Sequence, residues 1–149
     1  MKRISIQNIH PGLRVKKKTI QLLVQNVLAS EKANSGVDVI FVDDRFMRKL
    51  NKQFTLKGGT TDVLSFEMSG SQLAGVECPS LGDVYVSLDQ AKRQAAEYNV
   101  GFQDEVALLV VHGLLHLLGY DHKNKKEENI MRRKEQLHLR KVGKVFKSS

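Results

Sequence analysis

Cysteine is almost absent from this sequence, and so are long hydrophobic runs. Cys78 is the only cysteine among 149 residues, so the chain cannot form an internal disulfide or a zinc site made of cysteines alone. The longest apolar stretch, Val106 to Leu118, spans about 13 residues and includes two histidines, whereas a membrane-spanning helix needs about 20 apolar residues. The N-terminus alternates polar and apolar residues and lacks the apolar core of a secretion signal. These absences favour a cytoplasmic protein without a membrane segment.

Glycine and proline are also scarce, with 11 and 2 residues, which excludes a fibrous or low-complexity chain. The sequence is 41% hydrophobic and 27% charged, a globular composition that is too apolar for disorder. Because 149 residues suffice for one hydrophobic core but not for two, we expect a single domain over residues 1–149.

Positive charge is concentrated at the C-terminal end. The net charge is +8, and residues 1–122 carry 14 Lys and Arg against 13 Asp and Glu, while residues 123–149 carry 10 against 3. This bias indicates an anionic partner such as nucleic acid, although a solvated basic helix face would also explain it. The candidate phosphate contacts are Lys123, Lys125, Lys126, Arg132, Arg133, Lys134, Arg140 and Lys141.

Four short segments have the residue pattern of β-strands, and apolar residues at helical spacing predict five helices. The strands are residues 4–7, Val37–Val42, Asp62–Met68 and Gly82–Val86, with a loop expected over Ser69–Ser80. The first three helices have the apolar positions Ile20, Leu23, Val24 and Val27; Phe46, Met47, Leu50 and Phe54; and Leu88, Ala91, Ala95 and Tyr98. Asp43 or Asp44 can cap the second of these helices, and Ser87 can cap the third.

The fourth helix should begin near Asp104 and Glu105 and remain apolar on nearly every face until Leu118, so we expect it to be the central buried helix. The last helix, roughly Lys126 to Lys141, is expected to turn its apolar residues to the protein body and its basic residues to solvent. Those apolar residues are Ile130, Leu137 and Val142, and His10 and His138 are expected at the surface.

Three histidines carry the strongest functional signal. His112 and His116 are four residues apart on the fourth helix, so their imidazoles project from one face and can reach one metal ion. Gly119 in a left-handed conformation would reverse the backbone and let His122 return as a third ligand. Three imidazoles with an open fourth position are typical of a catalytic zinc site. The alternative, three core histidines without a metal, is disfavoured because each unpaired buried polar group costs about 1–3 kcal/mol.

The spacing H-x-x-x-H-x-x-G-x-x-H matches that of the metzincin proteases, with one difference. Gly113 follows the first histidine, where those enzymes carry the glutamate that acts as general base. Because glycine cannot accept a proton, the sequence does not predict a peptidase.

The run HGLLHLLGYDH resembles the signature of the YbeY family of metal-dependent endoribonucleases, which are rRNA maturation factors. Thr61–Phe66 (TDVLSF) and Leu81–Asp83 (LGD) are similar to further family motifs, and the similarity spans about residues 37–122 in the family's order. The resemblance implies an α+β fold in which a mixed four-stranded sheet and helices pack around a central, zincin-like metal-binding helix. It also implies one zinc ion held by His112, His116 and His122.

The function implied by the resemblance is a single-strand-specific endoribonuclease that acts in 16S rRNA 3′ end maturation and in ribosome quality control. Its partners would be rRNA and the ribosomal small subunit or its proteins. The sequence departs from the family where a Tyr-Arg pair and a proline usually precede the TDVLSF strand, because Phe54, Thr55 and Thr60 stand there. The missing arginine is a candidate phosphate contact in the family, and Lys57 is close enough in the chain to replace it as a point charge.

The remaining site residues are assigned by position alone. Asp121 adjoins a ligand and could bond an imidazole or the metal-bound water, and Asp62 and Asp83 could converge on the site from the sheet, although each also suits a cap or a turn. Arg132 and Arg133 join Lys57 as candidate substrate-binding residues. Two other functions stay open: a non-catalytic, metal-stabilised ribosome assembly factor, favoured by the missing arginine, and a metal-dependent hydrolase of a non-RNA substrate.

Overall fold

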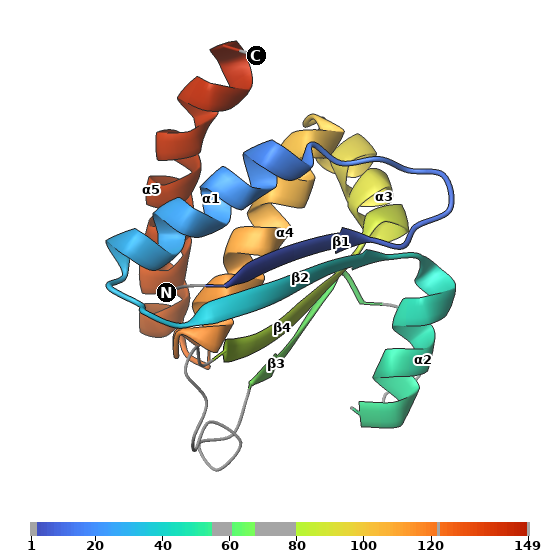
Figure 1. The fold of residues 1–149 in the computed structure, drawn as a ribbon, viewed down its shortest axis with the longest axis horizontal. Coiled ribbons are helices and arrows are strands. Elements are labelled where there is room, and N and C mark those ends of the chain that lie inside the picture. Colours follow the sequence, from blue (N-terminus) through green and yellow to red (C-terminus); the bar gives the residue numbers. More distant parts are fainter. Residues whose placement is uncertain (1–2, 55–60, 68–79, 122, 149) are drawn as a thin grey trace.

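A computed structural model describes residues 3–54, 61–67, 80–121 and 123–148, which contain the four predicted strands and the five predicted helices (Figure 1). The elements follow the predicted order, and α5 extends beyond the predicted Lys141. In chain order they are β1 (Ile4–Asn8), α1 (Lys17–Ser30), β2 (Gly36–Val42), α2 (Asp44–Phe54), β3 (Val63–Glu67), β4 (Ser80–Ser87), α3 (Leu88–Tyr98), α4 (Phe102–Leu117) and α5 (Lys125–Ser148).

The four strands form one mixed sheet in the order β1-β2-β4-β3. β1, β2 and β4 run parallel, and β3 pairs antiparallel with β4 at the edge of the sheet. The register places Ile6, Val39 and Val84 side by side, so their side chains lie on one face. The neighbouring positions, such as Asp38 and Asp83, lie on the opposite face.

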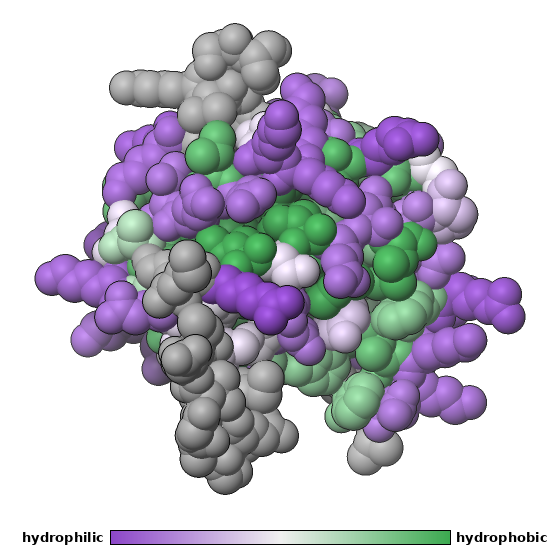
Figure 2. Space-filling view, viewed as in Figure 1, coloured by the Kyte–Doolittle hydropathy of each residue, from purple (hydrophilic) through white to green (hydrophobic). Residues whose placement is uncertain are grey.

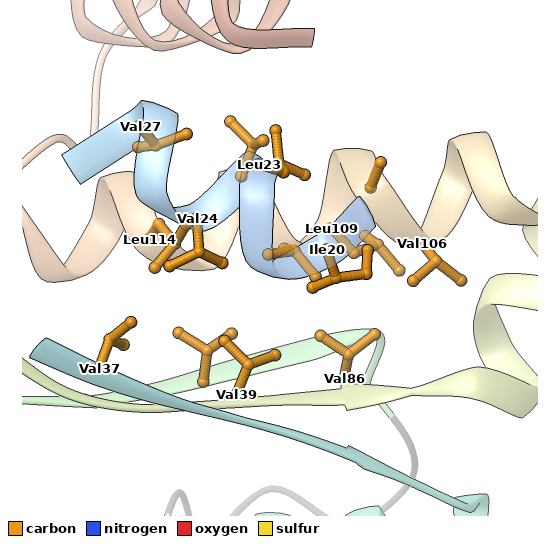
Figure 3. Close-up of a cluster of buried hydrophobic side chains, with 14 of the residues drawn as sticks. Ile20, Leu23, Val24, Val27, Val37, Val39, Val86, Val106, Leu109 and Leu114 are labelled. Atoms are coloured by element: carbon orange, nitrogen blue, oxygen red, sulfur yellow. The ribbon is translucent and has the colours of Figure 1, made fainter. Parts of the chain in front are cut away.

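The core lies between the sheet and two helices, α1 and α4. Figure 3 shows Val37, Val39 and Val86 pointing from the sheet toward side chains of these helices. Val106, Val110 and other α4 residues are fully buried, which confirms the prediction of a central buried helix. α5 packs against α1 and α4, whereas α2 lies on the other side of the sheet (Figure 1).

α5 turns a different face to the protein from the one we predicted. Ile130 and Leu137 are 42% and 45% exposed, whereas Met131 and His138 are buried. His138 is also not the surface residue expected, because its Nε2 bonds Glu31 Oε2 at 3.0 Å. The buried stripe of α5 includes ionisable residues, so the hydrophobic pattern pointed to the wrong face. The side chain of Val142 lies outside the described residues.

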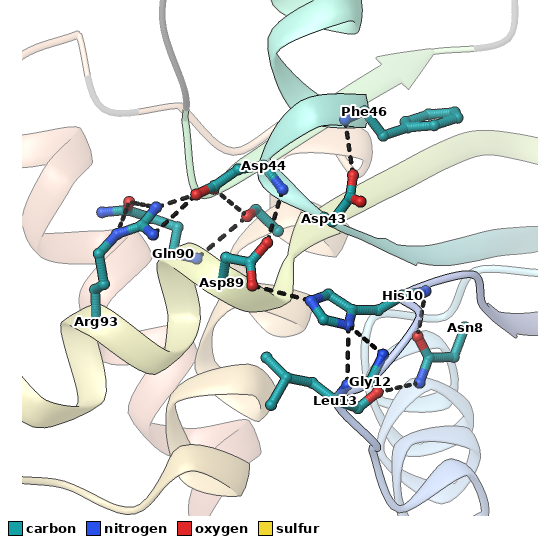
Figure 4. A network of polar contacts seen from close by, with 11 residues as sticks. Asn8, His10, Gly12, Leu13, Asp43, Asp44, Phe46, Asp89, Gln90 and Arg93 are labelled. Carbon is teal, nitrogen blue, oxygen red and sulfur yellow. Dashed lines mark hydrogen bonds and ion pairs between the residues drawn. The ribbon is translucent and has the colours of Figure 1, made fainter.

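His10 likewise belongs to a polar network instead of the surface (Figure 4). Its side chain is 9% exposed, its Nδ1 accepts the backbone N–H groups of Gly12 and Leu13, and its Nε2 donates to Asp89 Oδ1 at 2.9 Å. Asp89 Oδ2 accepts the backbone N–H of Asp44, the first residue of α2. The network therefore connects the loop after β1 to the first turns of α2 and α3.

The predicted helix caps are present, but three aromatic residues are more exposed than expected. Ser87 Oγ accepts the N–H of Gln90, and Asp43 Oδ1 accepts the N–H of Phe46. Phe46, Phe54 and Tyr98, which were assigned to apolar helix faces, are 36%, 57% and 59% exposed.

Among the described residues, no single helix is both long and apolar enough to cross a membrane. α3 and α4 together satisfy the length and composition criteria, but the pair is bent by 117° at its break.

Candidate metal centre

His112 and His116 project together from the last turns of α4 into a cleft beside β3. Their ring centroids are 4.9 Å apart and the ring planes are inclined by 73°, which confirms that the two imidazoles share one face. The cleft has a volume of about 490 Å³. Its described lining residues are Thr61, Asp62, Val63, Leu64, Ser65, Glu67, His112, His116 and Leu117.

Gly113 allows α4 to approach the sheet closely enough to form this cleft. A Cβ atom at Gly113 would lie 2.5 Å from Val84 Cγ1 and 3.1 Å from Val63 Cγ2. Ser65 Oγ donates a hydrogen bond to the Gly113 carbonyl at 3.0 Å, so its hydroxyl joins β3 to α4. Gly113 thus faces the sheet, and its role in this structure is close packing.

Glu135 on α5 orients His112. Its Oε2 lies 2.5 Å from His112 Nδ1, and the two side chains are 12% and 31% exposed. A carboxylate on Nδ1 sets the ring orientation and leaves Nε2 as the nitrogen suited to bind a metal. Sequence reasoning missed Glu135 because no motif contains it. The available signal was its spacing from Met131 and His138, which places all three on the inner face of α5.

The chain leaves α4 through the predicted reversal. Gly119 has a φ of 101°, and the Tyr120 N–H bonds the Leu115 carbonyl at 3.0 Å. The Tyr120 hydroxyl donates to Glu31 Oε1 at 2.6 Å, which fixes the turn to the end of α1. His122, the predicted third ligand, lies outside the described residues. Within the described part of the chain, no group of three or more His, Cys, Asp or Glu side chains could hold a metal.

Glu31 is the centre of a half-buried ionic cluster next to this turn. Besides Tyr120, its carboxylate accepts hydrogen bonds from Lys134 Nζ at 3.2 Å and from His138 Nε2 at 3.0 Å. Burial raises the pKa of Glu31, but the hydrogen bonds from Tyr120, His138 and Lys134 outweigh burial and leave the pKa below its usual value. The bond to Glu31 raises the pKa of Tyr120. The cluster joins α1, the turn and α5.

The two sheet aspartates do not converge. Asp62 lines the histidine cleft, and its Oδ1 accepts the Val63 N–H at 2.8 Å. Asp83 lines a second cleft, of about 490 Å³, on the opposite face of the sheet together with Asp38. Burial and the neighbouring Asp38 raise the pKa of Asp83. The expectation failed because strand register places Asp83 on the face away from α4.

The other predicted site residues lie at the margin of the centre or outside the described residues. Asp121 is half-buried, with Oδ2 3.7 Å from Lys123 Nζ. Arg132 lines a cavity of about 170 Å³ shared with His112 and Glu135, and it pairs with Glu128 at 3.0 Å. Arg133 is exposed on α5. Lys57 lies outside the described residues.

Comparison with known proteins agrees with the motifs. The family model described as Endoribonuclease YbeY matches residues 5–143. A protein named Endoribonuclease YbeY from Pelotomaculum thermopropionicum is 50% identical over 116 residues, 75% of this chain and 76% of that protein. Its namesake from Desulforamulus reducens is 38% identical over 152 aligned positions, 94% of this chain and 97% of that protein.

The fold is similar to the solution structure of TM1509 from Thermotoga maritima, with a TM-score of 0.69 and 27% identity over 98% of this chain and 93% of that one. The family match and the curated relatives both span most of the chain. The chain therefore belongs to the YbeY family of endoribonucleases.

Proposed function

We propose that this protein is a zinc-dependent, single-strand-specific endoribonuclease of the cytoplasm that matures the 3′ end of 16S rRNA and takes part in ribosome quality control. Family membership supports an endoribonuclease role. The observation that carries the metal dependence is the pair of imidazoles, His112 and His116, on one wall of an open cleft.

The two imidazoles that the structure describes are donors of the type that zinc prefers. Neutral imidazoles are common zinc ligands, and the contact between Glu135 and His112 is of the kind that supports a metal-binding histidine. His122 would supply the third nitrogen after the reversal at Gly119. Bound zinc in such a centre supplies Lewis-acid polarisation of a phosphoryl oxygen and lowers the pKa of a coordinated water to about 7.

The charge of the cleft supports the proposal that it holds a cation. Among the described lining residues, Asp62 and Glu67 are acidic and none is lysine or arginine, so the wall with the two carboxylates repels a phosphate. The imidazoles would hold the compensating cation at the opposite wall. Arg132 adjoins His112 from α5 and would stabilise the backbone of a bound RNA next to the centre.

The rRNA precursor and the ribosomal small subunit or its proteins would be the partners. A non-catalytic, metal-stabilised assembly factor is the second candidate, because Thr55 replaces the arginine that the family usually carries. In that case the metal would hold the end of α4 and the following turn without turnover.

The test is incubation of the zinc-loaded protein with single-stranded and structured fragments of the 16S rRNA 3′ region. We expect cleavage of the single-stranded fragment, and His116→Ala should lose both zinc and cleavage. Tight RNA binding without any cleavage, in protein shown to contain zinc, would reject the enzyme and favour the assembly factor.

A further inference from the structure

α2 carries four exposed cations on one side. Arg45, Arg48, Lys49 and Lys52 follow the spacing i, i+3, i+4, i+7, which aligns them along the helix. None of them pairs with a carboxylate of the described residues. On α5, Arg132 pairs with Glu128 and Lys134 pairs with Glu31, whereas other α5 cations such as Arg133 have no ion pair with a described residue. α2 therefore carries an aligned group of exposed cations without an acidic partner among the described residues, in addition to the basic residues of α5.

A row of aromatic rings begins and ends on α2 and crosses the strands β4 and β3. Phe46 stacks on Tyr85 with centroids 6.1 Å apart, Tyr85 contacts Phe66 at 5.7 Å, and Phe66 contacts Phe54 at 5.1 Å. Phe46 and Phe54, at the two ends of the row, are 36% and 57% exposed. Figure 2 shows hydrophobic surface on the side of α2 next to hydrophilic side chains. α2 thus carries exposed rings at Phe46 and Phe54 in addition to its four cations, which have no acidic partner among the described residues.

α2 presents these groups at a fixed position. Its first residue, Asp44, pairs with Arg93 at 2.8 Å, and Asp44 Oδ1 accepts a hydrogen bond from Ser87 (Figure 4). Met47 is completely buried beneath the helix. A binding surface on a rigid element keeps its geometry and loses little entropy when a ligand binds.

We propose that α2 and the adjoining rings bind a single-stranded RNA segment outside the metal centre. The cations would contact phosphates, and bases would stack on Phe46 and Phe54, which is how proteins bind single strands without sequence preference. The choice of RNA rests on the proposed function. An anionic membrane is disfavoured because the exposed rings are few and lie beside a sheet, not along a continuous apolar helix face.

The edge strand β3 connects the two sites. Ser65 points toward α4 and the histidine cleft, whereas the next residue, Phe66, points to the opposite face and contacts Tyr85. Because β3 is at the edge of the sheet, a strand of RNA passing around it can contact both faces. The α2 surface would thus hold RNA that extends beyond the cleavage position.

The test measures fluorescence anisotropy of a labelled single-stranded RNA of about 20 nucleotides, longer than one stacking platform requires. The full-length chain is used in EDTA, so that binding is read without cleavage. Replacing Arg45, Arg48, Lys49 and Lys52 by Gln should lower affinity about tenfold or more and reduce the slope of log affinity against log salt by up to about 2.8. Phe54→Ser should lower affinity about fivefold or more.

Matched controls remove the same charge and the same kind of ring elsewhere. One control replaces the exposed Lys16, Lys17, Lys18 and Lys92 by Gln, and the other is Tyr98→Ser, whose ring is 59% exposed on α3. An equal loss of RNA affinity in the fourfold α2 variant (the α2 set) and in the fourfold lysine control (the control set) would mean that only net charge matters. That result would overturn the proposal. Preferential binding of the parent to phosphatidylserine vesicles, lost in the α2 set while RNA binding is kept, would overturn it as well.

This outcome is separable from the proposed function. RNA binding that depends on α2, in a zinc-loaded protein that cleaves no RNA, supports the surface and rejects the enzyme. RNA cleavage by a protein whose RNA affinity is unchanged by the α2 substitutions supports the enzyme and rejects the surface. Urea unfolding of each variant confirms that a lost affinity does not come from lost folding.

Discussion

Glu135 Oε2 on α5 lies 2.5 Å from His112 Nδ1 on α4, and this contact joins the C-terminal helix to the candidate metal centre. The Glu135 side chain is 12% exposed, so its carboxylate is largely shielded from solvent, while His112 is 31% exposed toward the cleft. The helix that composition marks as a basic surface element thereby orients a histidine that we propose as a metal ligand.

Removal of Glu135 should weaken metal binding. We expect Glu135→Ala to lower zinc affinity by about 10- to 100-fold, because the imidazole loses the carboxylate that sets its orientation and raises its basicity. Glu135→Gln keeps an acceptor oxygen and should have a smaller effect. Competition with a chromophoric chelator gives the affinity. Glu128→Gln is the control, since Glu128 pairs with Arg132 and not with His112; equal affinity in all four proteins would contradict the assignment.

Gly113 should not tolerate even one methyl group. In Gly113→Ala the new Cβ would meet Val84 Cγ1 at 2.5 Å, and Val84 is fully buried and cannot move aside. We expect a loss of about 1–3 kcal/mol in the free energy of unfolding, although alanine has the higher helix propensity. Urea denaturation measures this. Gly12→Ala, where no atom lies within 4 Å of the added Cβ, should leave stability near the parent value; a stable Gly113→Ala protein would refute the close-packing role.

The Glu31 cluster should make stability depend on pH in the acid range. Hydrogen bonds from Tyr120, His138 and Lys134 lower the folded-state pKa of Glu31 below its usual 4.5. The carboxylate therefore contributes stability that is fully present above about pH 4.5 and is lost as the pH falls through the lower, folded-state pKa. Glu31→Gln should be less stable than the parent at neutral pH and should lose less of its stability on acidification. Thermal unfolding across this range measures both, and parallel pH profiles for the two proteins would contradict the prediction.

The order of strands and helices was predictable from the sequence because local periodicity reports which residues are buried. The alternation of polar and apolar residues around Ile6 reflects one face of β1. The apolar run through Val106 reflects one helix, α4. The pair His112 and His116 was predictable for the same reason, since four-residue spacing on a helix fixes their neighbourhood.

Contacts between distant helices were not predictable. Glu135 meets His112 across 23 residues and His138 meets Glu31 across 107, and no spacing rule connects such pairs. The hydrophobic pattern also predicted the wrong inner face for α5. His138 is polar, but it is buried there because its imidazole bonds Glu31. Asp83 was misplaced because one residue of register decides which face of a strand a side chain occupies.

Arg132 and Arg133 on α5 should contribute to RNA binding. Arg132 lines the small cavity beside His112, and Arg133 is exposed on the same helix. Replacing both by Gln should lower RNA affinity and reduce the salt slope by up to about 1.4, because each phosphate neutralised contributes about 0.7. Zinc content should stay unchanged, since neither residue is a ligand. Lys134 is left intact because its Nζ bonds Glu31 at 3.2 Å and its removal would disturb the turn. Affinity and slope equal to those of the parent would show that Arg132 and Arg133 lie on a solvated face and make no contact with RNA.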